Sequence, residues 1–375
     1  MTRPRMLLLT HYFPTHRGGV EISAGRVANL MSERGYDITW IASDSDAPPE
    51  DMPKIRFVSV PANNFTENKL GIPYPLWSRK ALSRIREALA NADIVHIHES
   101  LYQGNVMGAR MARKLGIPYV VTQHIGFIPY KNPLLRFILK TANKLVALPT
   151  LRGAKAVAFM SEITQAYFKS LGFEHPATEL IPFGVNTEIF SPTGPSDKSE
   201  FGFSNDLPMC VYVGRFVEKK GLPILRRLAT ANKNVQWAMA GWGPINPDEW
   251  GLPNVKVFRN LSGPTLAPLF RAADLFVMPS VGEGYPAVVQ ESMACGTPVL
   301  ITTETAEGYS PAKPYLNAVP ANDPDQWEET AKRLLSDLDS LNATSESISE
   351  FAREHWSWSR CVDRYEAMIQ KAVAL

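Results

Sequence analysis

The sequence has few cysteines, no long apolar run and no surplus of charge, and each shortage excludes a class of protein. Its three cysteines stand far apart and form no Cys-x-x-Cys pair. This argues against a disulfide framework and against a zinc site. No uninterrupted apolar segment approaches the roughly 20 residues of a membrane-spanning helix. The apolar run after Arg5 is shorter than the roughly 7–15 residues of a signal-peptide core. We therefore expect a cytoplasmic protein, either free or peripheral on the inner face of a membrane.

The charges nearly cancel, because 39 lysines and arginines accompany 37 aspartates and glutamates. A protein this close to neutral has no general attraction for nucleic acid, so we expect no nucleic-acid partner. Apolar material is plentiful, since 45% of the 375 residues are hydrophobic. A chain of this length exceeds one ordinary core and suggests two domains of roughly 150–200 residues each.

Short apolar strands alternate with helical segments in two separate runs. The first begins at RMLLLTHYF (5–13) and continues through YDITWIAS and ADIVHIH to IPYVVTQH (117–124). The second begins at LPMCVYVGRF (207–216) and continues to TPVLITT (297–303). Between them, residues 190–206 are rich in Pro, Gly, Ser and charge, which is typical of a hinge. The alternation predicts an α/β fold with two parallel sheets, each covered on both faces.

Two glutamates stand in VGEGYPAVVQESMACGTPVL (281–300), beyond a predicted strand end, where ligands of open α/β sheets bind. Glu291 lies on a semi-apolar face of a short predicted helix, where a carboxylate needs hydrogen-bond donors such as sugar hydroxyls. Glu283, Gly284 and Tyr285 lie at the N-terminus of that helix, which favours anionic or oxygen-rich ligands. A surface loop with a capping glutamate explains the bare pair equally well.

Two basic residues follow another predicted strand, in VGRFVEKKG (213–221). Arg215 offers a planar fork to phosphate and Lys220 offers a compact charge. Together they can neutralise a diphosphate at the mouth of a parallel sheet. A solvated loop is the better interpretation of either residue taken singly.

Gly-rich loops also follow strands, in THRGGV (15–20) and AGWGP (240–244). Glycine lets a backbone approach a phosphate closely. Neither loop matches a dinucleotide-binding or P-loop pattern, and turn geometry explains both equally well. The glycines concerned are Gly18, Gly19, Gly241 and Gly243, together with Gly214 beside Arg215.

Histidines end two of the predicted strands, His98 in ADIVHIH and His124 in IPYVVTQH. A histidine in this position can act as a polar or acid–base group. A hydrogen-bonded loop histidine is the alternative, which we favour for His98. The His-Ile-His spacing resembles a metal pair, but alternate strand residues point to opposite faces. Asp-Ser-Asp at 44–46 also resembles a metal-binding pair and is expected to cap a turn.

The segment WSRKALSRIREALA (77–90) has apolar residues at helical spacing and four basic residues on its other faces. It is interpreted either as an ordinary surface helix with an inward apolar stripe or as a helix on an anionic membrane. The apolar residues are Trp77, Ala81, Leu82, Ile85 and Leu89, and the basic residues are Arg79, Lys80, Arg84 and Arg86.

Taken together, these segments resemble the retaining glycosyltransferases of family four, group 1, which have the GT-B fold and a Glu-x7-Glu motif. The resemblance runs from HYFPTHRGGVE near the start through IPFGVNTEIF, VGRFVEKKG, AGWGP and ADLFVMPSVGEGYPAVVQESMACGTPV to HWSWSRCVDRYEAM. It implies two facing Rossmann-like domains with a cleft between them. The implied boundaries are an acceptor domain at 1–190, a linker at 191–206, a nucleotide-sugar domain at 207–355 and a helix at 356–375 that returns to the first domain.

The resemblance also implies roles for individual residues. Arg215 and Lys220 would bind the diphosphate of a UDP- or GDP-sugar donor, Glu291 the ribose hydroxyls and Glu283 the transferred sugar. The remaining positions are Gly284, Tyr285 and Pro286 near that sugar and the diphosphate, Gly18 and Gly19 closing on the phosphates from the first domain, and His124 near the reacting sugar. Fixed cations and helix N-termini would stabilise the leaving diphosphate, so no metal or other cofactor is required.

The sequence departs from the family pattern at two places. Asn186 stands where relatives usually carry Asp, and ETAEGYSPAKPY (304–315) replaces the usual Gly-Gly-Glu after TPVLITT. The second departure leaves the donor sugar undetermined, whether hexose or N-acetylhexosamine. The acceptor is expected to be a hydroxyl of a glycan, a lipid-linked molecule or a small molecule. The alternatives to a transferase are a non-catalytic nucleotide-sugar-binding scaffold and, less favoured, an epimerase or a phosphorylase of the same fold.

Overall fold

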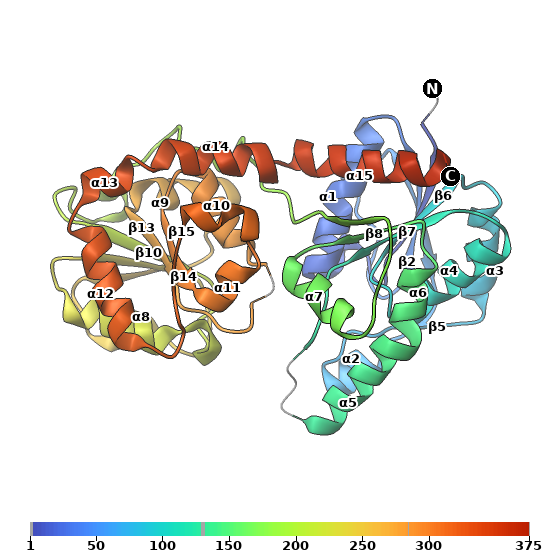
Figure 1. Ribbon diagram of the computed structural model, residues 1–375, viewed down its shortest axis with the longest axis horizontal. Helices are drawn as coiled ribbons and strands as arrows, with labels where there is room; N and C mark the ends of the chain where they lie inside the picture. Colours follow the sequence, from blue (N-terminus) through green and yellow to red (C-terminus); the bar gives the residue numbers. More distant parts are fainter. Residues whose placement is uncertain (1–2, 129–131, 284, 375) are drawn as a thin grey trace. The chain divides into compact units, whose positions relative to one another are not determined.

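The computed structural model of the chain describes residues 3–128, 132–283 and 285–374 (Figure 1). It divides into two compact units. Unit 1 comprises Met1–Pro182 together with Cys361–Leu375, and unit 2 comprises Phe183–Arg360. Each unit is built on one parallel sheet packed with helices, which confirms the predicted α/β class with two Rossmann-like sheets.

The sheet of unit 1 has seven strands in the order β3-β2-β1-β6-β7-β8-β9. Every neighbouring pair is parallel. The strands are continuous apolar runs because helices cover both faces, so Met6 to Leu9 of β1 are all buried. Their bounds are β1 Arg5–Leu9, β2 Asp37–Ser43, β3 Ile55–Val60, β6 Ile94–His98, β7 Tyr119–Gln123, β8 Ala156–Phe159 and β9 Thr178–Leu180, with an antiparallel pair β4 Ala62–Asn63 and β5 Leu76–Trp77 beside them.

Two long helices of unit 1, α1 (Gly19–Glu33) and α4 (Gln103–Lys114), end where the sequence places glycine. Gly35 after α1 and Gly116 after α4 have φ angles of +90° and +70°, which favour glycine. The other helical segments are η1 Pro14–His16, α2 Phe65–Leu70, α3 Lys80–Leu89, α5 Pro133–Ala142, the π-helix η2 Asn143–Ala147, α6 Leu148–Arg152 and α7 Glu162–Ser170.

The last helix, α15 (Trp358–Ala374), contributes its residues from Cys361 onward to unit 1. Tyr365 is fully buried there. The Arg34 guanidinium bonds to the Asp363 carboxylate at 2.7 Å and to the Glu366 carboxylate at 2.8 Å. These ion pairs fasten the C-terminal turns to α1.

The sheet of unit 2 has six parallel strands in the order β12-β11-β10-β13-β14-β15. Strands β10 and β13 are therefore neighbours, although a long stretch of chain separates them. The bounds are β10 Met209–Val213, β11 Gln236–Ala240, β12 Val255–Phe258, β13 Leu275–Met278, β14 Val299–Thr302 and β15 Leu316–Val319.

The helices of unit 2 pack on a core that contains the fully buried aromatic residues Trp237, Trp327 and Phe270. The helical bounds are η3 Lys198–Phe201, η4 Glu218–Lys220, α8 Leu222–Ala231, η5 Pro247–Trp250, η6 Gly263–Thr265, α9 Ala267–Ala272, α10 Ala287–Ala294, α11 Thr303–Glu307, η7 Ser310–Tyr315, α12 Pro324–Leu335, α13 Leu338–Asn342 and α14 Ser345–Trp356.

The Pro- and Ser-rich segment 191–206 lies within unit 2. Phe203 is buried in the core of that unit. Lys198 forms an ion pair with Asp274 at 2.7 Å, and the Arg271 guanidinium donates to the Pro195 carbonyl at 2.9 Å. Side chains of unit 2 thus hold this segment in place.

Helix α3 turns its apolar stripe into the core of unit 1. Trp77, Ala81, Ile85 and Leu89 are buried, while Leu82 is exposed. The structure therefore shows the ordinary packing expected of an inward-facing stripe. In the part of the chain that the structure describes, no helix combines the length and the apolar character needed to cross a membrane.

Candidate active site

The loops after β10 and β11 lie against each other, and glycines make this contact possible. The amide N–H of Phe216 donates to the Trp242 carbonyl at 2.7 Å, and Ile245 N–H donates to the Phe216 carbonyl at 3.1 Å. A Cβ at Gly241 would stand 1.9 Å from the Gly214 carbonyl oxygen, and one at Gly243 would stand 2.3 Å from the Phe216 oxygen. Loop packing alone therefore requires glycine at 241 and 243.

Arg215 stands at the exposed rim of these loops. Its guanidinium carbon lies 5.1 Å from the centre of the Trp242 ring, and the Trp242 side chain is 64% exposed. Such an arrangement is a cation–π contact, which orients the arginine without neutralising its charge. The Tyr212 hydroxyl donates to the Arg215 carbonyl at 3.0 Å and fixes the backbone below it.

Lys220 and Glu283 meet although 62 residues lie between them in the sequence. The Lys220 Nζ stands 2.8 Å from Glu283 Oε1, and both side chains are mostly shielded from solvent. Two backbone features bring them together. Val281 N–H donates to the Lys219 carbonyl at 2.9 Å. Gly221 has a φ of +74°, and a Cβ added there would stand only 2.2 Å from the Pro279 carbonyl oxygen. The ends of β10 and β13 thus present one cation–carboxylate pair.

Helix α10 carries Glu291 and begins just after Pro286. Burial raises the pKa of the Glu291 carboxyl to about 7. Gln290, the preceding residue, is buried and donates to the Phe183 carbonyl at 2.8 Å, which anchors the helix. Glu291 is therefore held on a fixed helix face, and its charge changes near neutral pH.

Tyr309 supports the turn that precedes α10. Its ring stacks on Tyr285 at 4.0 Å, and its hydroxyl donates to the Pro286 carbonyl at 2.7 Å. Tyr309 is fully buried and belongs to the segment that departs from the family pattern. That segment forms α11 and η7. Gly284, which the sequence also places in the site, lies outside the described residues.

In unit 1, Gly18 and Gly19 begin helix α1. Gly18 occupies the N-cap, and a Cβ there would stand 2.1 Å from Glu21 Oε2. Glu21 thus folds back over the helix N-terminus, where a negative charge is favoured. Its other oxygen bonds to His11 Nε2 at 2.7 Å, and both side chains are buried. The His11 ring stacks on Tyr102 at 3.6 Å.

His124 and His98 meet at the carboxyl ends of β7 and β6. His98 Nδ1 lies 2.9 Å from His124 Nε2. Burial lowers the pKa of His124 to about 3, so its imidazole is neutral at physiological pH. The histidines therefore serve as hydrogen-bonding groups in the free protein. For His98 this is the hydrogen-bonded role that we favoured from the sequence.

Glu99 holds the loop that carries His124. Its Oε1 accepts hydrogen bonds from the backbone N–H groups of His124 and Ile125, both at 2.6 Å, and its Oε2 accepts from Gln123 Nε2 at 2.7 Å. Burial nevertheless raises the pKa of Glu99 to about 8. Glu99 also has a φ of +77°, an uncommon conformation for a residue with a side chain. We call His11, Glu21, His98, Glu99 and His124 the unit 1 cluster.

The Asp-Ser-Asp sequence at 44–46, expected to cap a turn, instead makes contacts with residues far away in the sequence. Asp44 Oδ1 accepts from Ala62 N–H at 3.0 Å, and Asp46 Oδ2 pairs with His16 Nδ1 at 2.7 Å. Among residues 3–128, 132–283 and 285–374, no group of three or more His, Cys, Asp and Glu side chains is arranged to hold a metal ion.

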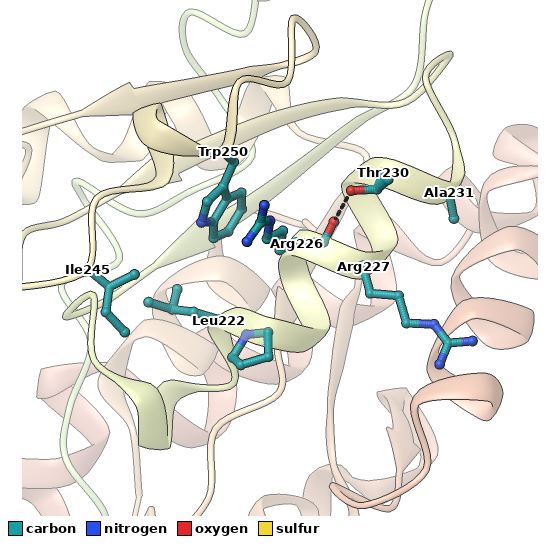
Figure 2. Close-up of a pocket in the computed structure, with 8 residues that line it drawn as sticks. Leu222, Arg226, Arg227, Thr230, Ala231, Ile245 and Trp250 are labelled. Carbon is teal, nitrogen blue, oxygen red and sulfur yellow. Dashed lines mark hydrogen bonds between the residues drawn. The ribbon is translucent and has the colours of Figure 1, made fainter.

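A groove runs along helix α8 (Figure 2). Its volume is about 540 Å³, and its lining is mostly apolar. Of the described residues predicted to bind the donor, none lines it. The groove is formed by Leu222, Pro223, Arg226, Arg227, Thr230, Ala231, Ile245 and Trp250. The predicted donor residues lie elsewhere: Lys220 pairs with Glu283, Arg215 lies over Trp242, and α10 carries Glu291. We call Arg215, Lys220, Glu283 and Glu291 the unit 2 cluster, together with Trp242, which the sequence did not single out.

Comparison with known proteins identifies the family. Residues 17–189 match the model of glycosyltransferase family 4, and residues 208–337 match the model of glycosyl transferases group 1. The two models together span most of the chain. The chain therefore belongs to the group-1 glycosyltransferases of family 4, and it is a retaining hexosyltransferase that uses a nucleotide-sugar donor.

Two curated relatives illustrate the range of the family. A GDP-mannose-dependent monoacylated α-(1-6)-phosphatidylinositol monomannoside mannosyltransferase of Corynebacterium glutamicum is 28% identical over 57% of the chain, and the match spans 61% of that protein's length, less than two thirds. A D-inositol 3-phosphate glycosyltransferase of Nocardiopsis dassonvillei is 26% identical over 92% of the chain and 88% of that protein.

Solved structures show the same fold. Sucrose-phosphate synthase from Thermosynechococcus elongatus superimposes with a TM-score of 0.78 at 19% identity, covering 99% of this chain and 100% of that one. HepE of Anabaena in complex with UDP superimposes with a TM-score of 0.75 at 16% identity, covering 98% and 99%. The fold is GT-B, as the resemblance implied.

Proposed function

We propose that the unit 2 cluster binds the nucleoside diphosphate-sugar donor and stabilises its leaving group. The observation that carries this proposal is the ion pair between Lys220 and Glu283, which joins the two donor motifs of the sequence at one place. A carboxylate and an ammonium side by side can contact a sugar hydroxyl and a phosphate of one ligand. Arg215 adds a second cation at an exposed position.

The roles of the residues follow from their charges and burial. Arg215 would take the diphosphate with its planar fork, while Trp242 keeps the guanidinium oriented. Lys220 would contact the diphosphate and leave Glu283 free to accept hydrogen bonds from the transferred sugar. Glu291 would accept the ribose hydroxyls. Binding of the anionic donor thus replaces one ion pair by a set of contacts between protein and ligand.

The chemistry requires stabilisation of negative charge as the diphosphate leaves the anomeric carbon. Two fixed cations supply it without reorganisation during the reaction. Retention of configuration agrees with attack from the face that the diphosphate leaves, through an oxocarbenium-like ion pair. His124, neutral because of its burial, would offer a hydrogen bond near the reacting sugar. Metal-independent transfer is part of the proposal.

For the acceptor we propose a hydroxyl of a glycolipid or a small sugar-like molecule. The support comes from the relatives, one of which is a phosphatidylinositol monomannoside mannosyltransferase and the other a D-inositol 3-phosphate glycosyltransferase. Contact of residues 77–90 with an anionic membrane is not part of the proposal, because only the basic side chains of this segment are available for it. Arg79, Lys80, Arg84 and Arg86 are exposed, whereas the apolar stripe of this segment is largely buried.

The test is calorimetric titration of the purified protein with UDP, GDP, ADP, TDP and their common sugars. We expect one nucleotide to bind in preference, with affinity reduced by Arg215→Ala and by Glu291→Ala. Arg226→Ala, which removes an exposed arginine of the α8 groove, serves as the matched control and should bind normally. Absence of binding to every nucleotide would contradict the proposed donor site.

The scaffold alternative has a distinct outcome in the same experiment. Donor binding with neither transfer to a broad acceptor panel nor slow hydrolysis would favour a non-catalytic protein. Conversion of the donor sugar without an acceptor would indicate an epimerase, and dependence on inorganic phosphate would indicate a phosphorylase.

A further inference from the structure

Helix α5 of unit 1 has an exposed apolar surface that its own unit does not cover. None of its described residues, Pro133–Ala142, is buried. The exposed fractions are 63% for Leu134, 68% for Phe137 and 51% for Ile138, and Leu145 in the following π-helix η2 is 67% exposed. In Figure 1, α5 projects from the body of unit 1. A soluble monomer rarely leaves such a contiguous set in water.

The opposite face of the same helical stretch attaches it to unit 1. Leu135, Leu139 and Val146 are partly buried, and Asn143 is buried and donates to the Tyr167 hydroxyl at 3.0 Å. The outward apolar residues are therefore not required for this packing. The helix is also fixed at its start, because Asn132 accepts from Leu134 N–H at 2.9 Å and Pro133 occupies the first turn. It is formed before any partner binds.

Cations flank the outward apolar residues. Arg136, Lys140 and Lys144 follow one another at intervals of four, which places them on one stripe of the helix, and all three are exposed. In the surrounding sequence, lysine and arginine occur without any aspartate or glutamate. From residue 100 to residue 161 there are nine lysines and arginines and no acidic residue, whereas the remainder of the chain has 30 basic and 37 acidic residues. The stretch of sequence that contains α5 therefore carries a net positive charge.

We propose that the outward face of α5 and η2, residues 133–147, docks on a lipid bilayer whose surface carries anionic headgroups. Leu134, Phe137, Ile138 and Leu145 would enter the boundary between headgroups and acyl chains, and the three cations would contact the phosphates. A preformed helix with an apolar stripe beside a basic one is the chemistry of interfacial membrane binding. Its length is far below the roughly 20 residues needed to span a bilayer.

The combination favours lipid over the other polyanions. Nucleic acid would engage the cations but leave four large apolar side chains in water, because its surface is lined by phosphates. This docking is independent of the donor site, which lies in unit 2, so the two proposals can fail separately.

The experiment is co-flotation of the full chain with vesicles of phosphatidylcholine alone or of phosphatidylcholine with phosphatidylglycerol. One variant replaces Leu134, Phe137, Ile138 and Leu145 with Ser, and a second replaces Arg136, Lys140 and Lys144 with Ser. The matched control replaces the exposed α3 cations Arg79, Lys80, Arg84 and Arg86 with Ser, so it removes more charge from the same unit. Thermal unfolding and nucleotide titration without vesicles check that each variant is folded.

We expect the wild type to bind anionic vesicles at least about tenfold more tightly than neutral ones, since each basic residue near the surface adds attraction. Both α5 variants should lose about tenfold or more in affinity for anionic vesicles, and the α3 variant about twofold or less. Equal binding of the wild type to both vesicles would overturn the proposal. So would an equal loss in the α3 variant, or wild-type binding by the variant without the four apolar residues. If the wild type binds heparin but not vesicles, and the variant without the four apolar residues still binds heparin, the surface would be assigned to a soluble polyanion instead.

Discussion

The unit 1 cluster and the unit 2 cluster occupy the same kind of place, the carboxyl ends of parallel strands, but they differ in how their charges are satisfied. In unit 1, His11 pairs with Glu21, and His98 bonds to His124. His11, Glu21 and His98 are buried and His124 is partly buried, so these contacts lie mostly out of solvent. In unit 2, Arg215 is exposed above Trp242, and only Lys220 has an anionic partner.

The difference teaches that one architecture can serve two purposes. A cluster whose side chains bond to one another is held in a fixed arrangement, which suits the positioning of an acceptor. A cluster with an unneutralised arginine gains most from an anionic ligand, which suits a diphosphate. The comparison predicts that mutations in unit 2 act mainly on the donor and its reaction.

Glu283→Ala should have the largest effect, because it removes the carboxylate proposed to contact the transferred sugar. We expect the rate of transfer to fall by about 10²–10³-fold, the usual loss when one preorganised polar group is removed. Donor affinity should change much less, since Lys220 then meets the diphosphate without competition. Steady-state kinetics with donor titration separates the two effects.

Glu218→Ala is the control for that variant, because Glu218 is an exposed acid in the same η4 segment as Lys220. It should transfer sugar at the wild-type rate. Near-normal transfer by Glu283→Ala would remove Glu283 from the mechanism and leave its ion pair with a structural role.

Arg215→Ala should weaken donor binding by about 10- to 100-fold, because a hydrogen bond to a charged group contributes roughly 1.5–3 kcal/mol. Trp242→Ala should weaken it only about threefold, because an exposed cation–π contact contributes roughly 0.5–1 kcal/mol. Calorimetry on both variants measures the ratio. A larger loss for Trp242→Ala than for Arg215→Ala would mean that the indole contacts the donor itself.

The sequence predicted the fold well because buried parallel strands are continuous apolar runs with glycine after the helices. The resemblance to the family also assigned Lys220 and Glu283 to one donor. The structure explains why they meet, because β10 and β13 are neighbouring parallel strands that end at the same edge of a sheet. Pairing of the two side chains was not predictable, since it depends on the hydrogen bond between Val281 and Lys219. The close contact between the two loops, which requires glycine at 241 and 243, was also not predictable from the sequence.

Several supporting residues left no local signal. Glu99 acts on a loop 25 residues away, Glu21 pairs with His11 across the Gly-rich loop, and Tyr309 lies in a segment recognised only as a departure from the family. The composition of 191–206 resembles that of a linker. In the structure, however, Lys198 and Pro195 of this segment bond to Asp274 and Arg271 of unit 2, about 75 residues further along the chain. Local patterns do not encode such distant contacts.

The pH dependence compares two glutamates with raised pKa values, the partly buried Glu291 and the buried Glu99. Burial raises the pKa of Glu291 from its usual 4.5 to about 7 and that of Glu99 to about 8. Between pH 4.5 and those values the folded protein holds a proton that the unfolded chain releases. Their contributions to the free energy of unfolding therefore fall as pH rises through these windows. Glu291→Gln and Glu99→Gln should each flatten that dependence in urea titrations, the first up to pH 7 and the second up to pH 8.

The pH dependence of donor binding should follow the ionisation of Glu291 and not that of Glu99. If the ribose hydroxyls bond to its carboxylate, nucleotide affinity at pH 6 should be about tenfold lower than well above pH 7, because only a small fraction is then ionised. Glu291→Gln should bind weakly at every pH, and Glu99→Gln should keep the wild-type profile. A profile that Glu291→Gln leaves unchanged would assign the titration to another group.

Tyr309→Phe tests whether the departure from the family pattern supports the donor site, and its effect should be the smallest. The change keeps the stack on Tyr285 and removes the hydrogen bond to the Pro286 carbonyl, which contributes about 1 kcal/mol. We expect the melting temperature to fall by about 2–4 °C and donor affinity to fall threefold or less, because the turn before α10 keeps its position but loses one support. Tyr315→Phe, in the same segment, is the control and should melt like the wild type. If both variants melt alike, Tyr309 acts through its ring alone, and the turn is held by Gln290 and the loop contacts of β13.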